Sequence, residues 1–102
     1  MKKFTLIYIV FCFLNNSYSN DLKYELFVDN LEVPWAFVFL PDNSILITER
    51  KGELIHFKNG NRTTIKNLPE IISKNQGGLL DIELHPNHSE NRWIYISYSS
   101  SN

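Results

Sequence analysis

Two stretches of this chain carry the same short pattern, in which apolar residues run into a proline turn. Phe37-Val38-Phe39-Leu40-Pro41-Asp42 is repeated as Ile82-Glu83-Leu84-His85-Pro86-Asn87, 45 residues later. A β-rich run follows each turn, at residues 45–48 and 93–97, and the second turn is three residues longer. A four-stranded unit that recurs every ~40–50 residues is typical of propeller blades. The repeat therefore predicts propeller blades, with a β-sandwich or an open barrel as alternatives.

Turn-forming residues divide the rest of the chain into short apolar runs. Alternating apolar residues at 24–28 predict a strand with one apolar face. The continuous apolar run 35–40 predicts a strand covered on both faces, and Asn59-Gly60 predicts a hairpin. Further strands are expected at residues 45–48, 54–57, 63–65, 79–84 and 93–97. Because no stretch after residue 19 has a helical period, we expect an all-β fold.

Residues 1–19 have the layout of a secretory signal peptide. A pair of lysines precedes the apolar run 4–14, and Ser17 and Ser19 supply small residues at the −3 and −1 positions of a cleavage site. A run of this length is short for a bilayer span, which makes an uncleaved anchor the weaker alternative. We expect cleavage after Ser19, no membrane span afterwards, and a periplasmic or secreted protein.

The chain that remains after cleavage has no disulfide and a mildly acidic charge. Cleavage removes the only cysteine, Cys12, so no disulfide compensates for a small core. It leaves eight Lys and Arg against eleven Asp and Glu, a net charge of −3. Because no Lys/Arg cluster occurs either, nucleic acid and anionic membrane surfaces are not expected partners.

Six segments stand in an order that resembles one enzyme family. They are Val33-Pro34-Trp35, Leu40-Pro41-Asp42, Thr48-Glu49-Arg50-Lys51-Gly52, Gln76-Gly77-Gly78-Leu79-Leu80-Asp81, His85-Pro86 and Trp93-Ile94-Tyr95-Ile96-Ser97-Tyr98. This string resembles the start of the glucose/sorbosone dehydrogenases, the soluble aldose dehydrogenases that use pyrroloquinoline quinone (PQQ). The resemblance implies a six-bladed β-propeller with the quinone at one end of its channel, often with calcium. Residues 20–102 would then be its first one to two blades, an incomplete domain.

Gln76 is the residue that the resemblance assigns to the site, near the quinone and the sugar. A neutral amide can donate to a quinone or sugar oxygen and accept from a hydroxyl at any pH. Gly77 and Gly78 leave the backbone free for close approach of a ligand, so they are candidates for a backbone contribution. The alternative is a flexible turn before the strand at residues 79–84. Asn75 departs from the family, which commonly has glycine there.

Other polar residues are weaker candidates for a site. Glu49-Arg50 is characteristic of the family, but an acidic–basic pair at a strand end more often satisfies a turn. His85 and His88 have ligand-type side chains without a third ligand, so no metal site is expected in this chain. Asp81, Glu83 and His85 share one strand face, which fits either a polar channel or a solvated surface.

The resemblance places the catalytic base, a histidine, beyond residue 102. None of His56, His85 and His88 matches its motif, and the arginine and calcium contacts also lie downstream in the family. The sequence therefore predicts the N-terminal portion of a quinoprotein oxidoreductase that oxidises aldoses at C1 to lactones, inactive on its own. The electron acceptor is left open. A non-catalytic propeller of the same superfamily, binding a protein or a glycan, is the alternative.

Overall fold

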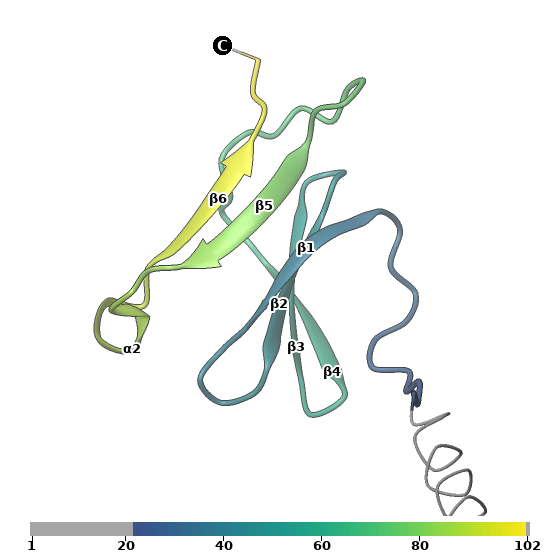
Figure 1. The fold of residues 1–102 in the computed structure, drawn as a ribbon. Helices are drawn as coiled ribbons and strands as arrows, with labels where there is room; N and C mark the ends of the chain where they lie inside the picture. Colours follow the sequence, from purple (N-terminus) through teal and green to yellow (C-terminus); the bar gives the residue numbers. More distant parts are fainter. Residues whose placement is uncertain (1–21, 102) are drawn as a thin grey trace, which may run out of the picture.

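The computed structural model describes residues 22–101, which form two antiparallel sheets (Figure 1). The first sheet is a four-stranded meander and the second is a hairpin that packs beside it. The meander comprises β1 (Pro34–Phe39), β2 (Ile45–Glu49), β3 (Glu53–Lys58) and β4 (Asn61–Ile65); the hairpin comprises β5 (Leu79–Leu84) and β6 (Ile94–Tyr98). The expected strands after residue 34 and the Asn59-Gly60 hairpin are confirmed. The signal peptide predicted at residues 1–19 lies outside the described residues.

The repeat seen in the sequence is reproduced by the two hairpins. β1 and β5 begin 45 residues apart, and each carries a register shift just after its start, before Ala36 and Ile82 respectively. The Ala36 amide donates to Thr48 Oγ1 at 3.1 Å, and the Asp81 amide donates to Ser97 Oγ at 3.0 Å. Because both backbone irregularities and side-chain contacts recur, β1–β2 and β5–β6 are copies of one structural unit.

Backbone hydrogen bonds at both ends of the two hairpins match as well. At one end, the Arg50 amide donates to the Val33 carbonyl at 2.9 Å and the Ser99 amide to the Gly78 carbonyl at 3.0 Å. At the other end, Leu40 donates to Ser44 and His85 donates to Trp93. Arg50 and Ser99 therefore occupy equivalent positions, one residue after the second strand of each unit.

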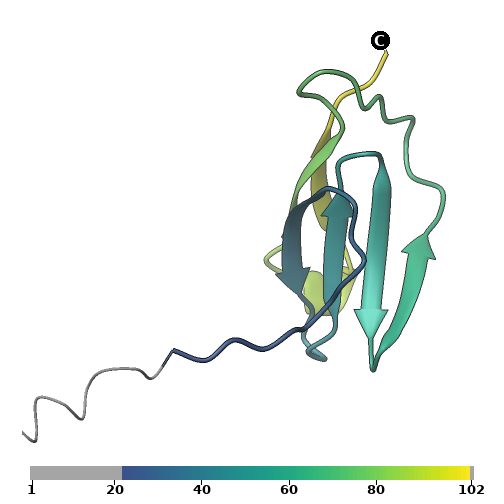
Figure 2. The same cartoon turned by 90° about the vertical axis from the view of Figure 1, so that its right-hand side faces the viewer.

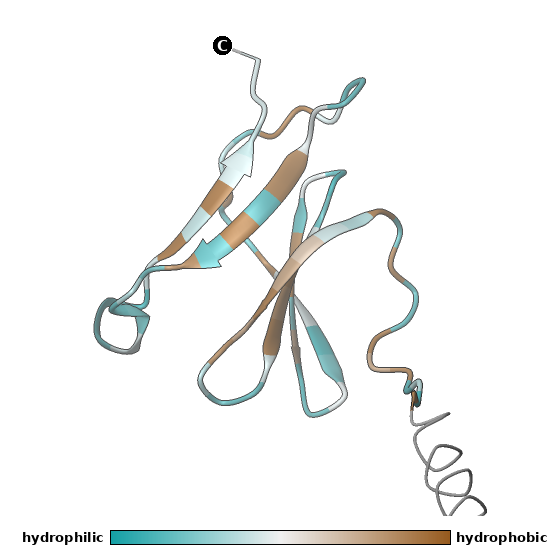
Figure 3. Cartoon of the chain, in the orientation of Figure 1, coloured by the Kyte–Doolittle hydropathy of each residue, from teal (hydrophilic) through white to brown (hydrophobic). Residues whose placement is uncertain are grey.

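The core lies between the two sheets because one face of the meander is aliphatic. Leu46 and Leu54 from the meander pack against Leu79 and Ile82 from β5, and all four are buried. Apolar and polar residues alternate along β5 (Figure 3), and Asp81 and Glu83 are exposed whereas Ile82 between them is buried. Burial of this face orients the hairpin on the meander and brings its first strand beside β1.

The opposite face of the meander is also apolar, but it is only partly covered. The buried residues Ile45, Ile47 and Ile55 pack there against Val28 and Leu31, from the segment that precedes β1. That segment crosses the sheet in Figure 2. The expectation that residues 35–40 would be covered on both faces is therefore wrong for this chain: Ala36 and Val38 face the core, whereas Trp35, Phe37 and Phe39 remain about half exposed.

The strand predicted at residues 24–28 does not form. A strand needs a partner for its backbone groups, and this segment instead lies across the sheet rather than along an edge of it. Arg62 donates to the carbonyl oxygens of Asp29 and Asn30, which orders the segment without making it a strand. Tyr24 and Leu26 consequently remain exposed.

The expectation of no helix fails at one point, a single helical turn labelled α2 (His88–Asn91). It lies in the longer second proline turn, and Arg92 ends it in the left-handed conformation with φ 63°. The additional residues of the second turn therefore form α2, while the strands on either side keep the repeated pattern. Within residues 22–101, no helix has the length and apolar character needed to cross a membrane.

Candidate functional site

The predicted site residue Gln76 lies on the connection between the two sheets. Residues 66–78 run from the end of β4 to the start of β5, and this connection lies at the same end of the meander as the β2–β3 turn (Figure 1). Gln76 is exposed on it. The turns β1–β2 and β3–β4 lie at the opposite end, together with α2. We call residues 72–78 the Gln76 loop.

The Gln76 loop is held at both ends by one hydroxyl group. Ser99 Oγ accepts a hydrogen bond from the Gly78 amide at 2.7 Å and donates to the Ile72 carbonyl at 2.7 Å. The Ser99 backbone repeats these links, because its carbonyl accepts from Ile72 and its amide donates to Gly78. Inside the loop, the Gly77 amide donates to the Lys74 carbonyl at 2.8 Å. These hydrogen bonds define the turn, and a site role for Gln76 stays a prediction.

Arg50 contacts the tip of the loop from the β2–β3 turn. Its Nη1 donates to the Asn75 carbonyl at 2.5 Å, and its own carbonyl accepts from the Leu79 amide at 3.0 Å. Asn75 has φ 57°, so its left-handed conformation carries the chain from the Arg50 contact into Gln76. The Glu49-Arg50 pair thus satisfies backbone groups, as expected: Arg50 binds a carbonyl of the predicted site loop, and Glu49 binds the Glu32 amide before β1.

Gly77 and Gly78 are required by the packing of the loop on the protein. A Cβ atom at residue 78 would lie 2.1 Å from the Arg50 carbonyl oxygen, and one at residue 77 would lie 2.5 Å from Ser99 Oγ. Gly78 is buried and has φ 147°, which L-residues rarely adopt. The structure therefore supplies a reason for these glycines different from ligand approach. A backbone contribution to ligand binding stays a prediction.

Carboxylates around Lys51 give this end of the sheet a mixed charge. Lys51 Nζ lies 2.9 Å from Glu32, 3.7 Å from Glu53 and 4.0 Å from Glu49. The hydrogen bond to Glu32, aided by the charges of all three carboxylates, raises the pKa of Lys51. Glu49 is buried and accepts the Glu32 amide at 2.6 Å. These contacts fix the β2–β3 turn from which Arg50 extends.

The two histidines considered as ligands are engaged in local hydrogen bonds instead. The Asn87 amide donates to His85 Nδ1 at 2.9 Å, and His88 Nδ1 lies 2.9 Å from the Trp93 carbonyl. Both contacts stabilise the turn that contains α2. Residues 22–101 hold no group of three or more His, Cys, Asp or Glu side chains that could bind a metal ion.

One row of hydrogen-bonded side chains, Asp42, Ser44 and His56, was not anticipated from the sequence. Ser44 Oγ donates to Asp42 Oδ1 at 2.5 Å, and His56 Nε2 lies 2.9 Å from Ser44 Oγ. A nucleophilic serine must donate its hydroxyl hydrogen to the histidine, whereas here the Ser44 hydroxyl donates its hydrogen bond to the Asp42 carboxylate. The group closes the β1–β2 turn, at the end of the sheet opposite Gln76. The Asp-Asn-Ser turn signal locates the turn, but only the fold brings His56 to it.

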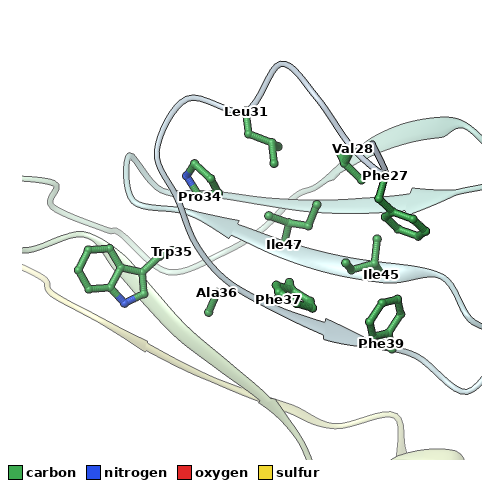
Figure 4. A pocket seen from close by; sticks show the side chains of 10 residues that line it. All are labelled: Phe27, Val28, Leu31, Pro34, Trp35, Ala36, Phe37, Phe39, Ile45 and Ile47. Carbon is green, nitrogen blue, oxygen red and sulfur yellow. The ribbon is translucent and has the colours of Figure 1, made fainter. Parts of the chain in front are cut away.

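A second feature that the sequence did not reveal is an apolar groove on the partly covered face of the meander (Figure 4). Its volume is about 440 Å³, and it lies between the segment before β1 and strands β1 and β2. Phe27, Trp35, Phe37 and Ile47 are among the residues that line it. Since it has few polar groups that could orient a sugar, we do not assign substrate binding to it.

Comparison with known proteins relates this chain to sugar dehydrogenases. A family model described as Glucose / Sorbosone dehydrogenase matches residues 31–102. The chain is 44% identical over 78 residues to aldose sugar dehydrogenase YliI of Escherichia coli strain K12, in an alignment that covers 74% of this chain and 21% of that protein. It is 34% identical over 89 residues to quinoprotein glucose dehydrogenase B of Acinetobacter calcoaceticus, with 82% and 19% covered.

Solved structures show the same relationship in three dimensions. The apo form of the soluble aldose sugar dehydrogenase from Escherichia coli superimposes with a TM-score of 0.66 at 43% identity, over 71% of this chain and 22% of that one. The PQQ-bound aldose sugar dehydrogenase from Streptomyces coelicolor gives 0.65 at 27% identity, over 71% and 22%. The chain spans about a fifth of the length of the curated relatives that it matches.

Proposed function

The chain belongs to the glucose/sorbosone dehydrogenase family, and from that membership we propose that it is the N-terminal portion of a PQQ-dependent enzyme that oxidises aldoses at C1 to lactones. Residues 20–102 would form the first one to two blades of a six-bladed propeller. The observation that carries the proposal is the match over residues 31–102, together with the exposed amide of Gln76 on an ordered loop at one end of the first blade.

The residues at this end fit a ligand rich in carbonyl and hydroxyl oxygens. The Gln76 amide offers both a donor and an acceptor, is uncharged at every pH, and lies in solvent on a backbone that several hydrogen bonds restrain. In this chain, Gln76 would therefore bind and orient the sugar or the quinone. If calcium is bound, the family resemblance implies that most of its ligands lie beyond residue 102.

Oxidation at C1 removes a proton from the sugar hydroxyl and a hydride from the carbon. The quinone would supply the two-electron acceptor, and a histidine beyond residue 102 would take the proton. Since His56, His85 and His88 are each engaged in turns away from Gln76, none of them is assigned as the base. The contribution of this chain is to hold the substrate or the quinone in position.

The test is a dye-linked assay of the full-length protein with a panel of aldoses, with and without added PQQ and calcium. We expect turnover only when PQQ is present, with the lactone as the product detected by mass spectrometry. A folded protein that binds glycan or protein but oxidises no aldose under these conditions would favour the non-catalytic propeller instead.

In the same assay, Gln76→Ala is expected to lower turnover while leaving the melting temperature nearly unchanged. The side chain is exposed, so its removal disturbs little packing, whereas loss of one hydrogen bond to a neutral ligand costs about 0.5–1.5 kcal/mol. The neighbouring exposed residue Lys74 provides the control Lys74→Ala. Unchanged kinetics for both sugar and quinone in Gln76→Ala would contradict the site role.

Export is also part of the proposal, with cleavage after Ser19 and a periplasmic or secreted location. Sequencing of the N-terminus of exported protein tests it, and an N-terminus at Asn20 is the expected result. Exported protein that still carries Met1 would show that the segment is not cleaved.

A further inference from the structure

We propose that Arg50 and Ser99 are positioning residues, which act on the reaction by fixing the Gln76 loop and hence the direction of the Gln76 amide. The inference rests on the site role proposed above for Gln76. Neither residue is assigned a contact with substrate; both act through the backbone of residues 72–78.

The two residues hold different parts of the loop. Ser99 joins its ends, since the hydroxyl bridges the Gly78 amide and the Ile72 carbonyl at 2.7 Å each. Arg50 holds its tip, since the guanidinium donates to the carbonyl of Asn75, the residue immediately before Gln76. An exposed side chain on a loop keeps one direction only if the backbone beneath it is restrained. These contacts restrain it on both sides.

Their places in the repeat explain why two such different side chains meet on one loop. Arg50 and Ser99 are equivalent residues of successive structural units, each directly after the second strand, and their amides make the matching bonds to Val33 and Gly78. Arg50 reaches forward from the first unit to the loop that leads into the second. Ser99 holds that same loop from within its own unit. The contact of Arg50 with the tip of the Gln76 loop therefore forms only when the two units pack together.

The glycines of the loop are consistent with this close fit. The positions where Cβ atoms of residues 77 and 78 would lie are within 2.5 Å of Ser99 Oγ and 2.1 Å of the Arg50 carbonyl respectively. The backbone at residues 77 and 78 thus lies so close to Arg50 and Ser99 that there is no room for a Cβ atom, and only glycine fits.

The first experiment measures the restraint itself, by amide hydrogen exchange on the full-length protein. In Arg50→Met and in Ser99→Ala, amides of residues 74–79 are expected to exchange several-fold faster, because the open loop becomes more populated. Arg62→Met is the matched control: Arg62 likewise donates from its guanidinium to backbone carbonyls, those of Asp29 and Asn30, but these belong to the segment before β1. Unchanged exchange in both Arg50→Met and Ser99→Ala would overturn the proposal.

The second experiment asks whether the two residues act through Gln76. Arg50→Met is expected to lower kcat/KM for the sugar on the order of tenfold, because small displacements of a binding group have large effects on rate. Arg50→Lys, which retains a donor, should recover part of this loss, and Arg62→Met should have no effect. In a Gln76→Ala background, Arg50→Met should add less than about twofold, since coupled residues are not additive.

The outcomes separate this inference from the proposed function. Additive losses in the double variant, with Gln76→Ala itself impaired, would leave the site role standing and overturn the positioning role. Unaltered kinetics in Gln76→Ala would overturn both roles, even if exchange in the loop still rose in Arg50→Met.

Discussion

At the scale of single residues, position 78 shows how tightly the loop is fitted to the sheet. Gly78 combines a left-handed backbone with the closest approach in the loop, because its α-carbon faces the Arg50 carbonyl. Gly60 also has a positive φ, of 78°, but a Cβ atom there would meet nothing within 4 Å. A comparison of substitutions at the two positions therefore separates the cost of backbone conformation from the cost of steric contact.

We expect Gly78→Ala to destabilise the full-length protein more than Gly60→Ala does. The left-handed backbone alone costs a non-glycine residue about 1–2 kcal/mol, and at residue 78 the displacement of Arg50 adds to that cost. Chemical denaturation of the two variants checks this order. Equal losses of unfolding free energy would show that the loop moves away from Arg50 without penalty.

The pKa of the Asp42 carboxyl is set by contacts within the β1–β2 turn and with Lys58 on β3. The Ser44 hydroxyl donates to its carboxylate at 2.5 Å, the Ser44 amide does so at 2.9 Å, and Lys58 lies at 3.1 Å. The Ser44 hydroxyl first, then its amide and the Lys58 ammonium, hold the pKa of Asp42 well below its usual range. Because the folded pKa is lowered, the ionised carboxylate stabilises the fold above the ordinary aspartate value of about 3.9, and this contribution falls as the pH drops below it.

Asp42→Asn should therefore be less stable than the wild type at neutral pH, with a difference that shrinks below about pH 4, where the unfolded carboxyl becomes protonated while the folded one is still ionised. Thermal melts of the full-length protein over this pH range measure it. Ser44→Ala removes the hydroxyl donor, so its thermal stability should depend less on pH than that of the wild type. A difference between Asp42→Asn and wild type that stays constant into acid would contradict the assignment.

At the scale of elements, Thr48 connects the two sheets through a hydrogen bond inside the core. Its hydroxyl accepts from the Ala36 amide at 3.1 Å and donates to the Leu80 carbonyl at 2.6 Å, and the side chain is fully buried. Ala36 and Leu80 lie where the ladders of β1 and β5 are irregular. Since a bulge leaves backbone groups without a ladder partner, Thr48 supplies partners to both strands at once.

Thr48→Val should lower the unfolding free energy by about 1–3 kcal/mol, because both backbone groups lose a buried partner while the side-chain shape is kept. Thr64→Val on β4 is the matched control, since Thr64 is exposed, and its change should be within about 0.5 kcal/mol. Denaturant melts of the full-length variants give the comparison. A Thr48→Val protein as stable as Thr64→Val would mean that Thr48 does not hold the sheets together.

At the scale of the whole molecule, the meander has two apolar faces and the hairpin covers one of them. The other carries Trp35, Phe37 and Phe39, with 51%, 59% and 54% of their surfaces exposed, because the segment before β1 covers this face only in part. A propeller blade buries both faces against its neighbours, and repeat architectures generally need about three or more units for stability. This surface is therefore the one against which we expect another blade of the complete protein to pack.

Residues 20–102 produced alone are thus expected to melt without a sharp transition, to associate, and to oxidise no aldose with PQQ and calcium. Each large apolar side chain left in water forgoes about 1.5–3 kcal/mol of burial, which is large beside a net domain stability of about 5–15 kcal/mol. Phe37→Lys with Phe39→Lys should reduce the association in light scattering. A sharply melting monomer, or quinone-dependent turnover, would contradict the expectation.

Much of this fold follows from the sequence alone, because strands, turns and the repeat depend on neighbouring residues. Local alternation and turn residues located every strand after residue 34, and the 45-residue spacing matches the spacing of β1 and β5. The segment 24–28 had the same local pattern and formed no strand, since pairing requires a neighbour that the pattern does not describe. Family motifs, rather than spacing, were what singled out Gln76.

The surroundings of Gln76 were decided only by the tertiary structure. Arg50 is 25 residues from Asn75 in the sequence, and Ser99 is 21 residues from Gly78. Ser99 meets the loop because β5 pairs with β6. Arg50 meets it because burial of Leu46, Leu54, Leu79 and Ile82 sets the hairpin on the meander in one orientation. A motif records which residues are present, whereas the direction of an amide depends on contacts that exist only after the sheets have packed.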